Sequence, residues 1–266
     1  MRRLNHACGS VTGRRRSVNE DGVLAAWPVF AVADGMGGHA DGAAASSSAL
    51  AELAALTAQA EHHSLTPDDV LSRLGLADDR VRALAGDGDE EGPGTTLAAV
   101  VALQLRGRDY WMVLNVGDSR VYRLAGGLLE QVSVDHSLVQ ELVDAGDLVP
   151  GDARRHAQRH VVTRALGAPG ASGPDCWLVP MTGGDRLLLC SDGVTSVVDD
   201  VEVARLLREH AQPDAALAAL LGAVTQRSGP DDASAVVVDV SADDNDLDGL
   251  DASTRPRAAA APAVRS

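Results

Sequence analysis

The stretch FAVADGMGGH, residues 30–39, joins a short apolar run to an Asp-Gly pair at Asp34 and Gly35. The apolar letters predict a buried strand that ends at the aspartate. By itself, an Asp-Gly pair after a strand predicts a hairpin turn. Glycine also lets the backbone approach closely, so the carbonyl of Gly35 could act as a ligand beside the Asp34 carboxylate.

Carboxylates flank three further apolar runs in the same manner. Asp118 follows VLNVG, Asp192 follows LLLCS, and the pair Asp231-Asp232 comes just before the last apolar run. Aspartates at the ends of separate strands can converge, and several carboxylates a few ångströms apart cannot all stay ionised without a cation. Hard divalent cations take carboxylate, carbonyl and water oxygens as ligands. Taken together, these aspartates therefore predict a divalent-metal site, although any one of the sites alone would predict a turn.

Helices are predicted to alternate with a series of short strands. Strands are expected at residues 28–33, 95–105, 110–116, 121–124, 186–191 and 233–240, and helices at 41–60, 67–85, 137–145, 201–210 and 214–227. An acidic, glycine-rich loop is expected at residues 86–94. Long helices beside several short strands predict a layered α/β or α+β domain.

The composition narrows the classes of function. With 266 residues, 45% of them apolar, the chain can bury a sizeable core. A net charge of −15 and an aromatic content of 2% argue against nucleic acid and anionic membranes as partners. Three cysteines without a C-x-x-C pair indicate a reducing compartment. No apolar run approaches the ~18 residues of a membrane span, and none resembles a signal peptide, so a cytoplasmic protein is expected.

The sequence changes character at about Ser241. An acidic run begins there and gives way to an Ala/Pro/Arg stretch that ends at Ser266. Such a segment cannot bury enough apolar surface to order itself. We therefore expect one folded domain over residues 1–240 and a disordered tail over residues 241–266.

Eight motifs resemble those of the protein phosphatase 2C-like (PPM) family, particularly its compact bacterial form. They are RSVNED at 16–21, DGMGGH at 34–39, GTTL at 94–97, NVGDSR at 115–120, DHS at 135–137, TRALG at 163–167, SDG at 191–193 and GPD at 229–231. One such motif is weak evidence, but eight in the family's order make a strong case. The resemblance implies an α+β fold, a four-layer αββα sandwich of two packed antiparallel sheets flanked by helices.

The resemblance also implies two tightly bound Mn²⁺ or Mg²⁺ ions, with a third, weaker ion in some bacterial members. The implied roles are Asp34 as the ligand of both tight ions, Asp192 and Asp231 as ligands of the first, the Gly35 carbonyl as a ligand of the second, Glu20 and Asp21 as holders of metal-bound waters, and Asp118 with Asp192 as the third-ion site.

The implied activity is that of a metal-dependent protein serine/threonine phosphatase. A metal-activated water would attack phosphorus in line, without a phosphoenzyme. Arg16, Asp34 and Asp192 are the expected catalytic residues, with Arg16 offering bidentate donors to the phosphate. The expected substrates are phosphorylated proteins, the targets of serine/threonine kinases in signal transduction, and the expected state is a monomer.

Three features depart from the family pattern or have two readings. Met36 stands where animal members carry a histidine proposed as general acid. Asp232 stands where the family usually has asparagine, and it could tune metal affinity or simply turn to solvent. The basic stretch at residues 154–160 could be a solvated loop, or a flap beside the site that attracts phosphorylated segments.

Three other functions fit parts of the sequence less well. GMGGHA at residues 35–40 fits the dinucleotide-binding pattern, but Asp34 would repel a pyrophosphate and no parallel strand is expected after the following helix. A pseudophosphatase that keeps the fold and binds a partner is a second alternative, although every implied ligand is present. Phosphatases of anti-sigma-antagonist proteins usually lack parts of this motif set.

Overall fold

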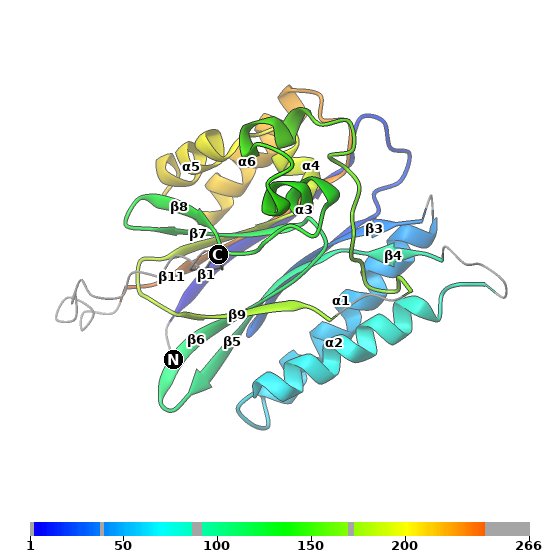
Figure 1. Ribbon diagram of the computed structural model, residues 1–266. Helices are drawn as coiled ribbons and strands as arrows, with labels where there is room; N and C mark the ends of the chain where they lie inside the picture. The colour runs from blue at the N-terminus through cyan, green and yellow to red at the C-terminus, as the bar shows by residue number, and fades with distance from the viewer. Residues whose placement is uncertain (1–2, 38–39, 87–91, 170–172, 243–266) are drawn as a thin grey trace, which may run out of the picture.

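A computed structural model describes residues 3–37, 40–86, 92–169 and 173–242. Two antiparallel sheets pack face to face, with helices on the outer side of each (Figure 1). The α+β, four-layer arrangement expected from the resemblance is confirmed. Residues 243–266, most of the tail predicted to be disordered, lie outside the described residues.

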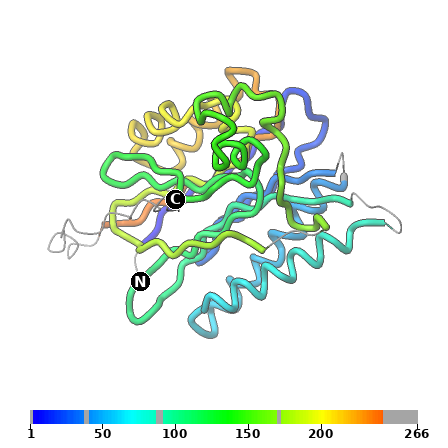
Figure 2. The backbone as a smooth tube through the Cα atoms, viewed as in Figure 1, coloured from blue at the N-terminus to red at the C-terminus, as the bar shows by residue number. Residues whose placement is uncertain are grey.

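Sheet I has five strands and joins the two ends of the described chain. In spatial order they are β1 (Leu4–Val11), β11 (Ala233–Val240), β10 (Arg186–Cys190), β7 (Arg120–Ala125) and β8 (Leu128–Gln131). Strand β1 pairs with β11 along its full length, from Leu4 opposite Val240 to Val11 opposite Ala233. The tube in Figure 2 shows these first and last strands running side by side.

Sheet II contains the stretch FAVADGM, residues 30–36. Its order is β2 (Asp21–Ala26), β3 (Val29–Met36), β5 (Leu97–Leu105), β6 (Arg108–Val116) and β9 (Asp175–Pro180), with the short β4 (Gly94–Thr95) paired to β3. Both neighbours of β3 in this sheet are antiparallel to it. A dinucleotide-binding unit needs a parallel strand beside the first one, so the geometry of β3 argues against that alternative.

Helices cover the outer faces of both sheets. They are α1 (Ala40–Ala60) and α2 (Pro67–Arg82) on sheet II, and α4 (Asp192–Thr195), α5 (Asp200–Glu209) and α6 (Pro213–Gln226) on sheet I. Helix α3 (Leu138–Ala145) and the 3₁₀ helix η1 (Pro150–Arg155) lie in the long connection between β8 and β9. None of the helices in the described ranges combines the length and apolar character needed to cross a bilayer.

The core forms three layers, which explains why β3 reads as a continuous apolar run. Phe30 and Val32 face the other sheet and pack with Leu187 and Val236. The alternate residues, such as Ala31, face α1 and α2. Because both faces of β3 are buried, no polar residue alternates along it. Each fully buried Leu, Val or Phe side chain stabilises the fold by about 1.5–3 kcal/mol.

The long helices and central strands were predicted near their observed bounds, and four strands were missed. The helix predicted at 67–85 begins with Thr66 as N-cap, whose side chain and that of Asp69 form a reciprocal capping box. The missed strands are β1, β2, β8 and β9. All four lie at sheet edges, and none of their residues is fully buried, so they are not the doubly buried strands that continuous apolar runs indicate most clearly.

Candidate active site

The predicted carboxylates come together at one end of the sandwich, where strands of both sheets finish. Asp34 lies near the end of β3, directly opposite Asp21 in the pairing of β2 with β3. Asp118 lies in the turn between β6 and β7, and Asp192 follows β10 as the first residue of α4. Asp231 precedes β11. Four of the five, all but Asp21, line one cleft of about 560 Å³.

The electrostatics of this cleft are those of crowded carboxylates. Burial raises the pKa of Asp21 to about 7, with added repulsion from neighbouring aspartates that two serine hydroxyls offset in part. Burial and repulsion from Asp192 likewise raise the pKa of Asp118 to about 7. The pKa of Asp34 lies well above its ordinary value, because it is desolvated and faces Asp21, Asp192, Asp118 and Asp231. Such a set favours a bound cation, which would remove the repulsion.

Asp21 shows the fit to a cation or its waters most clearly. Its Oδ2 accepts a hydrogen bond of 2.8 Å from the Ser191 hydroxyl. Its Oδ1 is buried, and no hydrogen-bond partner for it is found among the described residues. A buried carboxylate oxygen is costly to leave unpaired, so the donor set at this point suits a group that accepts electron pairs.

Arg16 lies at the same cleft but holds two of the predicted metal-site residues. Its Nε donates to Asp231 Oδ1 at 2.6 Å, and its Nη1 donates to Glu20 Oε2 at 3.1 Å. Within the described ranges, no three His, Cys, Asp or Glu side chains already stand in a metal-holding arrangement. Asp231 would therefore have to exchange its contact with Arg16 for an ion, which would free the guanidinium for an anionic group.

Asp232 does not turn to solvent, which corrects one of the two expectations for it. Its side chain is buried, with the whole residue 3% exposed. Oδ1 accepts from the backbone N–H of Gly13 at 2.9 Å, and Oδ2 accepts from that of Glu20 at 2.9 Å. The carboxylate therefore fastens both ends of the loop that carries Arg16. It also adds to the repulsion on Asp21.

The glycines after two of the aspartates are required by close backbone packing. A methyl group on Gly35 would lie 2.0 Å from the carbonyl oxygen of Gly42, and one on Gly193 would lie 1.9 Å from that of Asp232. Neither position accepts any other residue without movement of the backbone. The two Asp-Gly pairs thus mark places where β3 and α4 approach the backbone of another segment closely, and they are not hairpin turns.

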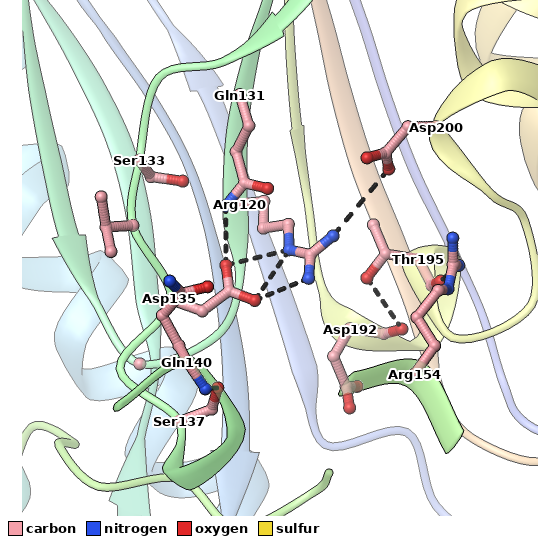
Figure 3. Close-up of polar contacts among 12 residues, drawn as sticks. Arg120, Gln131, Ser133, Asp135, Ser137, Gln140, Arg154, Asp192, Thr195 and Asp200 are labelled. Carbon is pink, nitrogen blue, oxygen red and sulfur yellow. Dashed lines mark hydrogen bonds and ion pairs between the residues drawn. The ribbon is translucent and has the colours of Figure 1, made fainter. Parts of the chain in front are cut away.

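The basic stretch 154–160 lies beside the cleft. Arg154 donates to the carbonyl oxygens of Thr195 and Val198, which joins η1 to the segment after Asp192. Figure 3 shows Arg154 reaching toward this segment, and His160 Nδ1 lies 3.6 Å from Asp192 Oδ2. The stretch therefore lies where the flap interpretation places it, and most of its side chains are exposed, as the solvated-loop interpretation expects.

Ser191 and Thr96 belong to two of the matching motifs, but the resemblance implied no role for either residue. Besides bonding Asp21, the Ser191 Oγ accepts from the backbone N–H of Ser234 at 3.0 Å. Thr96 accepts from the backbone N–H of Asp34 through Oγ1 at 3.1 Å and donates its own N–H to the Asp34 carbonyl at 2.9 Å. For Ser191 the available signal was its place directly before the predicted ligand Asp192, whereas Thr96 is far from any predicted ligand in the sequence and had only its place in the GTTL motif.

The family model described as Protein phosphatase 2C matches residues 8–237 of the chain. The chain belongs to the protein phosphatase 2C family. Among curated members, it is 37% identical over 247 residues to the serine/threonine protein phosphatase PstP of Mycobacterium tuberculosis, covering 89% of this chain and 45% of PstP. It is 37% identical over 211 residues to the serine/threonine phosphatase stp of Listeria monocytogenes, covering 74% and 80%. The chain thus spans less than half the length of PstP.

Solved structures of protein phosphatase 2C relatives share the same architecture. The M. tuberculosis phosphatase PstP/Ppp superposes with a TM-score of 0.81 at 34% identity, covering 90% of this chain and 99% of that one. The PPM Ser-Thr phosphatase MsPP of Mycobacterium smegmatis, solved with cacodylate, gives 0.79 at 36%, covering 89% and 98%. The catalytic domain of PstP with two manganese ions gives 0.79 at 33%, covering 90% and 98%. The sandwich seen here is the fold of this family.

Proposed function

We propose that the chain is a metal-dependent phosphatase of phosphoserine and phosphothreonine in proteins. The observation that carries this proposal is the gathering of carboxylates from both sheets at one cleft, with the pKa values of three of them raised by burial and mutual repulsion. The family membership supports the same reaction. The predicted ligands are all present, so nothing favours the pseudophosphatase alternative.

In this proposal the acidic residues of the site bind the metal ions, and Arg16 binds the phosphate. Asp34, Asp192 and Asp231 would hold two Mn²⁺ or Mg²⁺ ions with the Gly35 carbonyl, Glu20 and Asp21 would hold their waters, and Asp118 would hold a weaker third ion with Asp192. Bound ions of this kind lower the pKa of a water and neutralise charge on the phosphoryl oxygens.

Arg16 would orient the phosphate for in-line attack, since its planar guanidinium can donate two parallel hydrogen bonds. Met36 also lines the cleft, and a thioether has no proton to donate. The proton that the leaving serine or threonine oxygen needs therefore comes from a group other than residue 36.

The proposed substrates are proteins phosphorylated by serine/threonine kinases, and the proposed state is a cytoplasmic monomer. The three cysteines, Cys8, Cys176 and Cys190, are all free thiols in the structure, which suits a reducing compartment. A panel of phosphoserine, phosphothreonine and phosphotyrosine peptides tests the substrate class with Mn²⁺ present. We expect release of phosphate from the first two peptides. Turnover of phosphotyrosine alone, or of none, would contradict the proposal.

Replacement of Arg16 should chiefly weaken phosphate binding. Loss of a charged donor to phosphate costs about 1.5–3 kcal/mol, which corresponds to about a ten- to hundredfold fall in kcat/KM. We expect most of the loss from Arg16→Ala in KM, because the bound phosphate is already dianionic, and weaker inhibition by free phosphate. Arg16→Lys should recover only part of the loss. Steady-state kinetics of both variants measure this.

Arg14 provides the matched control, because it belongs to the same basic run but does not line the cleft. Arg14→Ala should behave like the unsubstituted chain. Mn²⁺ affinity should not weaken in Arg16→Ala, because Asp231 no longer has to give up a contact with the guanidinium in order to bind an ion. Unchanged kinetics and unchanged phosphate inhibition in Arg16→Ala would remove Arg16 from the site.

A further inference from the structure

His136 is a buried histidine of the DHS motif to which the proposed chemistry assigns no role. It lies between β8 and α3 and is 5% exposed. Its backbone N–H donates to the carbonyl oxygen of Gly117 at 2.9 Å, and its ring Nδ1 accepts from the backbone N–H of Gly117 at 3.1 Å. One residue therefore holds both polar groups of Gly117, which directly precedes Asp118.

Gly117 is the point at which the chain turns toward the cleft. Its φ of +96° is in the left-handed region, and a methyl group there would lie 2.6 Å from Thr96 Cγ2. The side chain of Asn115 donates a second hydrogen bond of 3.0 Å to the Gly117 carbonyl. Because the backbone at Gly117 is fixed in this way, the direction in which the Asp118 side chain leaves it is fixed as well.

The hydrogen bonds also determine the tautomer of His136. A neutral imidazole has one acceptor and one donor nitrogen, so an Nδ1 that accepts from Gly117 leaves the proton on Nε2. Nε2 lies 3.1 Å from Asp175 Oδ2 and 3.2 Å from Arg164 Nη1, and of these two groups only the carboxylate can accept its proton. Asp175 is held in turn by Arg164, whose Nη1 lies 3.1 Å from Oδ1. Carboxylate–imidazole pairs of this type keep a ring oriented.

The same histidine joins the Asp118 turn to the end of the basic stretch. Its carbonyl oxygen accepts from the backbone N–H of Thr163 at 2.9 Å, next to Arg164. Ser137 forms an isolated β-bridge with Val162 just beside it. The contacts of His136 therefore reach three segments: the Asp118 turn, the return from the flap, and β9 through Asp175.

We propose that His136 is a positioning residue that fixes the Gly117 peptide and thereby aims the Asp118 carboxylate, with Asp175 and Arg164 holding the imidazole in the tautomer this requires. The inference rests on the proposed function in one respect, namely that Asp118 serves the weaker metal position. His136 itself touches neither substrate nor metal in this account. Its effect is expected on the weak ion, and the two tight ions should bind as before.

Mn²⁺ binding to the full chain, followed by the electron paramagnetic resonance signal of free Mn²⁺, tests the proposal without relying on activity. His136→Leu removes the acceptor for the Gly117 N–H and should weaken the weak binding step by about tenfold or more, as loss of a partner behind a ligand usually does. His136→Asn places an amide oxygen where Nδ1 stood and should restore most of the affinity. Asp175→Ala, at a more exposed position, should weaken the same step less.

Ser133→Ala is the matched control. Ser133 is equally buried, and its Oγ accepts from the backbone N–H of Val121 at 3.0 Å, so the variant loses the same kind of hydrogen bond away from Gly117. It should lower the melting temperature but leave all Mn²⁺ steps unchanged. An equal loss of the weak step in Ser133→Ala, or its full retention in His136→Leu, would overturn the proposal.

The test also separates this inference from the proposed function. A weak step that disappears in Asp118→Ala but persists in His136→Leu contradicts the role of His136 alone. A weak step that persists in Asp118→Ala contradicts the metal assignment of Asp118 and removes the basis of the inference too. If His136→Leu does not fold, the comparison of His136→Asn with Asp175→Ala decides. Wild-type weak binding in Asp175→Ala would contradict the tautomer argument.

Discussion

Asp34→Asn should lower the turnover number by about a thousandfold or more while leaving the fold intact. Asp34 is the proposed ligand of both ions, and loss of about 4 kcal/mol of charge stabilisation in the transition state corresponds to that factor. Asparagine has nearly the same shape, so packing at the end of β3 is preserved. Kinetics on a phosphothreonine peptide at saturating Mn²⁺ measure the loss.

Thermal unfolding shows whether this loss is chemical or structural. Burial, and then repulsion from the crowded carboxylates around it, raise the pKa of Asp34. A neutral amide there should therefore leave the protein in EDTA at least as stable as the parent, while the stabilisation by Mn²⁺ shrinks. Asp68→Asn, an exposed change on α2, is the control and should alter neither quantity. A fully active Asp34→Asn would exclude Asp34 as the bridging ligand.

Arg186→Met should cause the largest loss of stability of any single change considered, although it lies far from the cleft. Arg186 begins β10, whereas Asp192 follows the other end of that strand. The guanidinium binds both oxygens of Asp239 at 2.6 and 2.7 Å, and it also donates to the carbonyl oxygens of Leu207, His210 and Ala211 at 2.6–2.8 Å.

Removing one partner from such a buried pair costs about 3–5 kcal/mol, because the remaining groups lose their hydrogen bonds. For a domain of this size we expect the melting temperature to fall by roughly 10 °C. Denaturant unfolding checks the free energy, and kcat measured well below the transition should be unchanged. Arg205→Met removes only surface ion pairs on α5 and should change little. A fall no larger than that of Arg205→Met would contradict the buried role of Arg186.

The elements of the fold that the sequence predicted are those with strong local signals. The central strands are buried on both faces and read as continuous apolar runs, and the helices begin at recognisable caps such as Ser137 of α3. Strand β1, LNHACGSV, pairs along a sheet edge with half of its residues exposed, so its pattern is too weak to mark a strand. The pairing of β1 with β11 joins segments that are more than 200 residues apart in the sequence. A pattern of neighbouring residues therefore cannot predict this pairing.

The candidate site divides in the same way. The aspartates stand out because each directly follows or precedes an apolar run, and the motif order added the expected roles. The contacts that hold them do not show in the sequence, because they connect distant segments. The Ser191 hydroxyl meets an oxygen of Asp21, and Asp232 bonds the N–H of Gly13 and Glu20. From the sequence, Asp232 could either alter metal affinity or turn to solvent. Only the three-dimensional packing shows that its carboxylate is buried.

The metal dependence of phosphoester hydrolysis is the most direct test of whether the clustered carboxylates hold catalytic divalent ions. The full chain, freed of divalent ions with EDTA and then dialysed, should show no measurable hydrolysis of p-nitrophenyl phosphate. Added Mn²⁺ should restore turnover in a saturable manner, because the carboxylates of both sheets would then hold the ions that activate water. Unchanged turnover in excess EDTA would show that hydrolysis does not depend on divalent ions held by these carboxylates.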